Sequence, residues 1–148
     1  MRAPVFLLAL IGLLLSSCGH ASPSHPEEPE VRSFLGRYFS TWSAADMEGY
    51  GNCFHPLARI VFVGPNGEVR SEGLTDFLHG QKMGHASSTE AMTEIPTSMS
   101  ITMEDRGAQA LVRWKLTKGN SIVTGTDLFT LVSTPKGWKI MSLVFYND

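Results

Sequence analysis

The sequence predicts an α+β domain in which N-terminal helices cover one face of a curved antiparallel sheet. Apolar and aromatic residues recur at helical spacing over residues 31–42. Four strand-like runs separated by short turns then follow one another over residues 99–146. The chain of 148 residues has room for a single domain once a leader is set aside. Helices first and consecutive strands afterwards are typical of the α+β class.

The N-terminal segment has the pattern of an export signal that ends in a cysteine. Arg2 precedes an unbroken apolar run over residues 5–15, and Ser16 and Ser17 lead into Cys18. This segment resembles the lipobox of bacterial lipoproteins. The resemblance implies a signal peptide over residues 1–17 and a lipid anchor at Cys18, which attaches the mature protein to a membrane of the bacterial cell envelope. An ordinary secretory signal is the alternative.

The residue after the cysteine and the segment that follows refine this expectation. Gly19 takes the place where an aspartate retains lipoproteins of this kind at the inner membrane, so the resemblance implies the outer membrane, facing the periplasm, if the source has two membranes. Residues 18–30 contain three prolines and small polar or acidic residues, which favours a solvated tether. The domain is then expected over residues 31–148.

Charge and cysteine content exclude several partners. The formal net charge is −2, with lysines and arginines dispersed singly, so nothing favours nucleic-acid binding. Cys18 and Cys53 are the only cysteines. If Cys18 carries lipid, Cys53 has no partner for an internal disulfide and is best interpreted as a small buried apolar residue.

The expected elements follow from periodicity and turn residues. A first helix carries an aromatic stripe, and a short second helix begins at an Asp46 N-cap and ends at His55-Pro56. A hairpin over residues 59–63 and 68–71 and a third helix from residue 74 to about 83 come next. Strands are expected over residues 99–104, 109–117, 122–132 and 138–146. The stripe of the first helix is Val31, Phe34, Leu35, Tyr38, Phe39 and Trp42.

The order of these segments resembles the nuclear transport factor 2-like (NTF2-like) superfamily, including its SnoaL-like and ketosteroid-isomerase-like branches. The motifs that carry the resemblance are the aromatic first helix, the Asp46…Tyr50…Phe54-His55-Pro56 segment, the Gly64-Pro65-Asn66-Gly67 turn followed by Gly73 and Phe77, and Asp127-Leu128-Phe129…Gly137-Trp138-Lys139-Ile140. The resemblance implies a cone-shaped sheet around a hydrophobic pocket that the helices cap. It also implies that a homodimer can form through the outer face of the sheet.

Strand alternation favours such a pocket independently. Ala110, Val112, Trp114 and Leu116 share one face of their strand, and polar residues occupy the other. The strand over residues 138–146 is apolar on both faces, so one of its faces needs a further cover, either a dimer partner or the domain itself. The expected ligand-binding residues are Tyr38, Trp42, Tyr50, Trp114, Phe129, Ser142 and Tyr146.

Two residues are candidates for acid-base chemistry. Asp127 shares the parity of Phe129 and Leu131, which predicts a carboxylate on an apolar face and a raised pKa. His55 is the candidate partner for Asp127, because catalytic branches of the superfamily use such dyads. A hydrogen-bonded aspartate at the pocket mouth and a turn histidine are the alternative interpretations. No metal-ligand pattern or cofactor motif is present.

Three functions remain open on the sequence. The favoured one is a membrane-anchored, noncatalytic module that binds a small hydrophobic ligand or a partner segment in its pocket. The second is an acid-base enzyme, of the isomerase, cyclase or dehydratase kind, that acts through Asp127. The third is a dimeric accessory protein of the envelope. The residue sets of ketosteroid isomerases and polyketide cyclases do not match here position by position, which argues against transferring either reaction.

Overall fold

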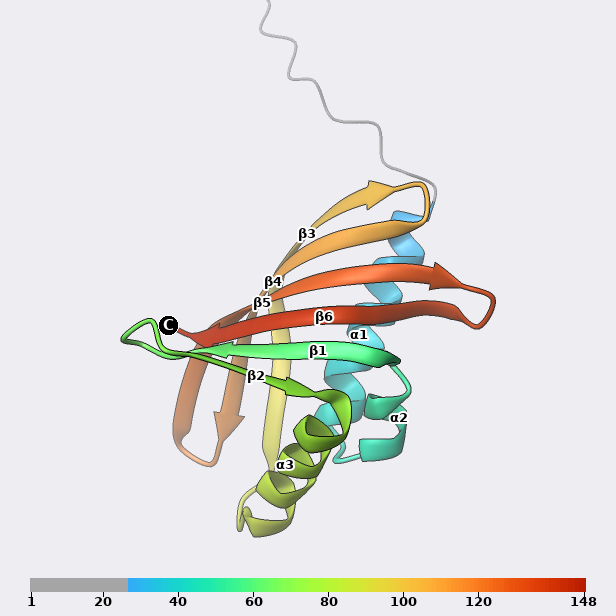
Figure 1. Cartoon of the computed structure of the whole chain (residues 1–148). Helices are drawn as coiled ribbons and strands as arrows, with labels where there is room; N and C mark the ends of the chain where they lie inside the picture. Colours follow the sequence, from blue (N-terminus) through green and yellow to red (C-terminus); the bar gives the residue numbers. More distant parts are fainter. Residues whose placement is uncertain (1–26) are drawn as a thin grey trace, which may run out of the picture.

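The computed structural model describes residues 27–148, and in it six strands form one strongly curved sheet against which three helices pack (Figure 1). The strand order is β2-β1-β6-β5-β4-β3. All neighbouring strands are antiparallel except β1 and β6, which run parallel. The helices are α1 (Glu28–Ser43), α2 (Met47–Gly51) and α3 (Leu74–Ser87), and the strands are β1 (Phe54–Val63), β2 (Val69–Gly73), β3 (Met92–Glu104), β4 (Gly107–Lys118), β5 (Ser121–Thr134) and β6 (Gly137–Asn147).

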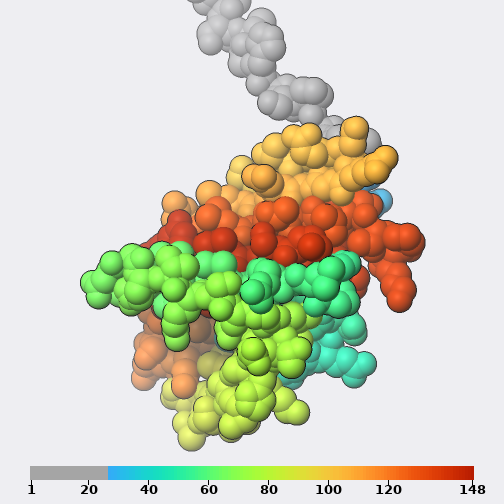
Figure 2. Space-filling view, viewed as in Figure 1, coloured from blue at the N-terminus to red at the C-terminus, as the bar shows by residue number. Residues whose placement is uncertain are grey.

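The helix α1 buries the aromatic stripe that the sequence predicts. All six residues of the stripe are buried, and the strands hide α1 almost entirely in the space-filling view (Figure 2). The helix begins at Glu28, so it takes in the last three residues of the predicted tether. Proline in the first turn and the acidic side chains of Glu28 and Glu30 favour a helix start at this point.

The predicted signal peptide and Cys18 lie outside the described residues. Over residues 27–148, none of the helices combines the length and the apolar character that a membrane crossing requires.

Two element boundaries differ from the prediction. Helix α2 ends at Gly51, and Phe54 opens β1, so His55 and Pro56 lie in a strand instead of ending a helix. The reason is tertiary: the Ile140 amide donates to the Cys53 carbonyl at 2.9 Å, and Phe54 pairs with Ile140 of β6. Strand pairing thus replaces the last helical turn.

The strand β3 begins at Met92 instead of residue 99, and α3 continues to Ser87. Met92 pairs with Lys118 at the far end of β4, so the whole length of β4 has a partner. The register shifts between Pro96 and Ser98, where the proline has no amide proton to donate. This irregularity divides a long strand into two alternating segments, and the residues that face inward change parity from one segment to the next.

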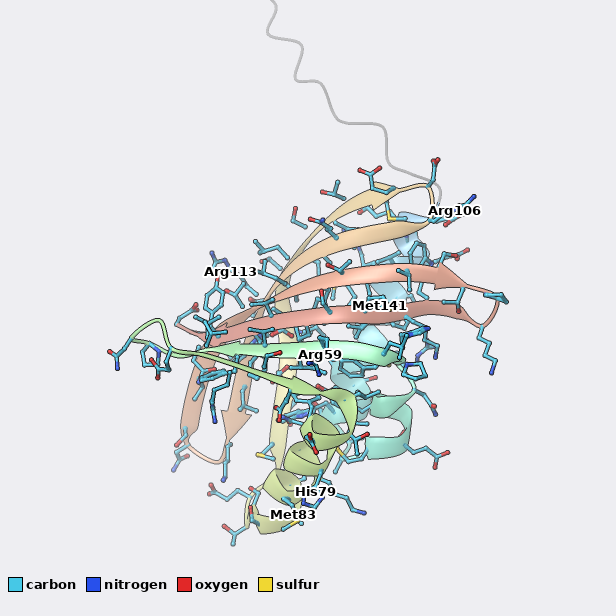
Figure 3. All side chains as sticks on the ribbon, viewed as in Figure 1. Arg59, His79, Met83, Arg106, Arg113 and Met141 are labelled. Atoms are coloured by element: carbon cyan, nitrogen blue, oxygen red, sulfur yellow. The ribbon has the colours of Figure 1, made fainter. Side chains whose placement is uncertain are left out.

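A bulge in β6 explains its two apolar faces. Leu131 pairs with Ile140 and Thr130 with Ser142, so Met141, labelled in Figure 3, is the extra residue. The parity therefore changes at Met141. Trp138 and Ile140 are buried before the bulge, and Leu143 is buried after it. A strict alternation would divide the apolar side chains of β6 between the two faces of the sheet. Because of the bulge, most of them lie on the inner face.

Candidate functional site

The inner face of the sheet and the three helices line a small, partly open pocket with aromatic walls. Its volume is about 170 Å³. Its side chains come from all three helices and from β3, β4, β5 and β6, which is why residues far apart in the sequence meet here. The lining residues are Tyr38, Trp42, Tyr50, Phe77, Gln81, Glu94, Trp114, Leu116, Asp127, Leu143, Phe145 and Asn147.

Asp127 is held at this pocket by the neighbouring strand. Its Oδ1 accepts a hydrogen bond from the Trp114 indole nitrogen at 2.8 Å, and the side chain is only 3% exposed. The indole has room because Gly125 is its cross-strand neighbour. A Cβ at Gly125 would lie 2.2 Å from the Trp114 ring and 2.4 Å from the Tyr146 carbonyl oxygen. The glycine therefore sets the position of the indole, and the indole sets that of the carboxyl.

The electrostatic environment of Asp127 favours its neutral form. Burial raises the pKa of Asp127 to about 7, while hydrogen bonds from Trp114 and Tyr38 lower it and oppose only part of that shift. Asp127 thus titrates near neutral pH, as the parity argument predicts for a carboxyl on an apolar face.

Two tyrosines continue the polar network from the helices. The Tyr50 hydroxyl donates to the Tyr38 hydroxyl at 3.0 Å, and both side chains are buried. Burial raises the pKa of each tyrosine well above 10, so both hydroxyls stay protonated. The network thus runs from α2 through α1 to the carboxyl on β5.

Glu94 brings a second carboxyl to the same pocket. Its backbone is fixed to the end of α1, since the Ser43 hydroxyl accepts from the Glu94 amide at 2.8 Å and donates to the Glu94 carbonyl at 3.0 Å. Burial and the charge of Asp127 raise the pKa of Glu94 to about 8. The pocket consequently holds two carboxyl groups, and the charge of Asp127 disfavours the ionisation of Glu94.

The outer part of the pocket joins α1 to α3. The Trp42 indole nitrogen donates to the Gln81 side-chain oxygen at 2.8 Å, and the Trp42 ring meets His85 edge to face at 4.5 Å between ring centroids. Over residues 27–148, no three side chains of His, Cys, Asp or Glu are grouped so that they could hold a metal ion.

Five of the residues singled out in the sequence meet in this pocket, and one lies just behind it. Phe129 is 2% exposed and packs edge to face on Tyr38, with ring centroids 5.1 Å apart, so it supports the wall without lining the pocket. The five residues that line the pocket are Tyr38, Trp42, Tyr50, Trp114 and Asp127.

Three other candidates lie elsewhere. His55 follows the inward-facing Phe54 in β1 and borders a separate depression with Asn52 and Lys139, so it does not pair with Asp127. Its Nδ1 accepts from the Leu57 amide at 3.2 Å. Ser142 and Tyr146 lie on the outer face of the sheet, because the bulge at Met141 reverses the parity of β6 beyond it.

Sequence reasoning missed Glu94, the amides Gln81 and Asn147, and the apolar lining residues of α3 and β6. The alternation of Met92, Glu94 and Pro96 was the available signal for Glu94, since it places a carboxyl among inward-facing residues. The register shift after Pro96 hides that signal. The inward-facing residues of β6 were missed because the bulge at Met141 interrupts the alternation, so no single period runs through the strand.

The curved sheet and the helices on its inner face form the fold that is described as NTF2-like or cystatin-like. A family model described as "Putative lumazine-binding" matches residues 26–146. The chain belongs to this family. None of the curated proteins matches it significantly.

Solved structures with the same fold come from several bacteria. A protein of unknown function from Mycobacterium tuberculosis has a TM-score of 0.69 at 18% identity, with 82% of this chain and 72% of that chain covered. An NTF2-like protein of unknown function from Pseudomonas putida has a TM-score of 0.70 at 13% identity, covering 83% and 87%. A "putative dehydratase" of the NTF2-like family from Streptomyces avermitilis has a TM-score of 0.68 at 15% identity, covering 81% and 94%. At these identities the likeness concerns the fold.

Proposed function

We propose that this protein binds a small, largely apolar molecule in the pocket without converting it. The observation that carries the proposal is the partly open pocket of about 170 Å³ with Tyr38, Trp42, Tyr50 and Trp114 among its walls. Such concave sites with aromatic walls and a few polar groups are the usual form of small-ligand pockets. A cavity of about 150 Å³ accepts a benzene ring, so this pocket has room for one ring with a small substituent. The family description, which names lumazine, supports ligand binding as well.

The experiment is a fluorescence titration with lumazine and with single-ring aromatic compounds. Trp42 and Trp114 line the pocket, whereas Trp138 does not, so ligand binding should change the tryptophan emission. Trp42→Phe should weaken binding at least several-fold. Trp138→Phe is the matched control, since both indoles are 8% exposed. Equal affinities in the two variants, or no saturable change with any compound, would contradict the proposal.

A specific observation favours acid-base catalysis as a second candidate function. Asp127 and Glu94 have pKa values of about 7 and about 8, and groups that titrate near the working pH are efficient proton-transfer catalysts. The Asp127 carboxylate would remove a proton next to the carbonyl of a small cyclic ketone, the protonated carboxyl of Glu94 would donate a hydrogen bond to the enolate oxygen, and Asp127 would return the proton.

Deuterium exchange into such a ketone, followed by nuclear magnetic resonance, tests this reaction. Catalysis requires exchange that Asp127→Asn reduces at least 100-fold while the circular dichroism spectrum shows that the variant remains folded. If the ketone binds but exchanges deuterium no faster than it does in buffer without the protein, the noncatalytic function is supported instead.

Membrane anchoring remains part of the proposal because it rests on residues 15–18 of the sequence. Lipid attached to Cys18 would hold the domain at the bacterial envelope, at the periplasmic side of the outer membrane in a cell with two membranes. Mass spectrometry of the mature protein should find acyl chains on a cysteine N-terminus, and Cys18→Ser should abolish them. A mature protein without acyl mass would refute the anchor.

The homodimer is proposed on the outer face of the sheet. Leu111, Leu128, Val144 and Val61 form one cross-strand row there, and Leu111 and Leu128 are each 38% exposed. Sedimentation should detect a dimer that Leu128→Asp dissociates. Ile122→Asp, at a strand end, is the control that should leave the dimer intact. Leu143 is 1% exposed in the core and does not belong to this row.

A further inference from the structure

The charges around the pocket are all of one sign. Of its twelve lining residues, Glu94 and Asp127 are acidic, and none is lysine, arginine or histidine. An anionic ligand would therefore meet two carboxyl groups and no positive partner in a pocket that is only partly open to water. The ligand must be neutral or cationic.

The hydrogen-bond donors of the walls are largely committed to protein acceptors. The Trp114 indole donates to Asp127, the Trp42 indole donates to Gln81, and the Tyr50 hydroxyl donates to Tyr38. Once the two carboxyl groups are ionised, what remains for a ligand is mainly their acceptor capacity, besides the side-chain amides of Gln81 and Asn147. A ligand that carries N–H donors complements such a pocket, whereas one that offers only acceptors does not.

The aromatic rings add a second attraction for positive charge. Six of the lining side chains are aromatic, and a cation near the face of such a ring is stabilised electrostatically, most strongly where water is excluded. Carboxylates behind aromatic walls therefore offer a cation both a charge partner and a surface to lie on.

We propose that the natural ligand of this pocket is a small, flat organic cation with N–H donors, whose apolar body lies between the aromatic rings and whose charged end meets Glu94 and Asp127. This inference rests on the proposed ligand-binding function and names its ligand class. The size of the pocket limits the body to about one ring.

Proton linkage follows from this arrangement. Below pH 7 and without the cation, both carboxyl groups hold protons. Binding of the cation displaces these protons. The titratable groups that face Asp127 are Tyr38 from α1, Tyr50 from α2 and Glu94 from β3, and the tyrosines stay neutral. With a pKa of about 7, only about a tenth of Asp127 is ionised at pH 6 and nearly all of it at pH 8.5. Affinity for a cation should rise about tenfold over this range.

The test uses three compounds of the same shape and different charge: benzamidine, benzamide and benzoate. Calorimetric titration of the purified protein at pH 8 should find benzamidine bound at least tenfold more tightly than benzamide, with no binding of benzoate. Benzamidine stays cationic from pH 6 to 8.5, and its affinity should rise with pH. Asp127→Asn and Glu94→Gln should each remove most of the preference for benzamidine over benzamide. Glu104→Gln, an exposed position on β3, should retain it.

The possible failures are distinct. If benzamide binds as tightly as benzamidine, or if benzamidine affinity is independent of pH, the pocket binds ligands but the cation inference is wrong. If none of the three compounds binds and lumazine does not bind either, the proposed ligand-binding function is wrong too.

Discussion

Replacing Asp127 with asparagine should change how the stability of this protein depends on pH. The carboxyl is 3% exposed and has a pKa of about 7, against 3.8 for an ordinary aspartate. Because the pKa is raised in the folded state, the folded protein holds a proton between about pH 4 and 7 that the unfolded chain has lost. The stability that this proton confers is fully present at low pH and is lost as the pH rises through 7.

The magnitude follows from the same two values. One pKa unit corresponds to about 1.4 kcal/mol, so the whole shift amounts to about 4 kcal/mol. The slope is about 1.4 kcal/mol per pH unit near pH 5 and falls to about half of that at pH 7, so Asp127 contributes a loss of about 2 kcal/mol between these two pH values. Asparagine keeps an oxygen that can accept from the Trp114 indole, and it does not titrate. Asp127→Asn should therefore match the wild type only below about pH 4, and exceed its stability by about 2 kcal/mol at pH 5 and by about 4 kcal/mol at pH 8.5.

Urea denaturation at pH 5, 6, 7 and 8.5, followed by circular dichroism, measures both profiles. Asp105→Asn, on the exposed β3–β4 turn, is the control that should follow the wild-type profile. Parallel profiles for the wild type and Asp127→Asn would refute the reasoning, since the carboxyl would then ionise as easily in the fold as in the unfolded chain.

Three further outcomes are expected. Gly125→Ala should destabilise the protein by about 2–3 kcal/mol and alter its near-ultraviolet circular dichroism, because the new methyl group overlaps the indole on β4; Gly80→Ala, with nothing within 4 Å, should be neutral or stabilising by up to about 1 kcal/mol. Tyr50→Phe should cost about 1 kcal/mol in urea denaturation by removing the bond to Tyr38, and an unchanged midpoint would mean that this bond contributes nothing. Glu94→Gln should make the free energy of unfolding fall less steeply between about pH 4.5 and 8 than it does in the wild type. A pH profile like that of the wild type would contradict the raised pKa of Glu94.

The position of Asp127 was predictable, and that of Glu94 was not. Asp127 lies within β5, where the alternation is regular from Asp127 to Leu131, so its parity with Phe129 and Leu131 is enough to place it on the inner face. Glu94 lies before a register shift, and a strand-based count from residue 99 never reaches it. His55 shows the opposite error: a local turn signal before proline was outweighed by strand pairing between Phe54 and Ile140.

By itself the sequence determined the α+β class, the buried stripe of α1, the dry face of β4 and the apolar setting of Asp127. These properties depend on periods within one segment, and such periods are set by the geometry of a single helix or strand. Only the tertiary structure decided where β3 begins, which side chains of β6 face inward and which second carboxyl joins Asp127. Those outcomes depend on bulges and on pairing between distant strands. One extra residue at a bulge exchanges the inward-facing and outward-facing positions beyond it, and the local sequence pattern does not reveal where that residue is.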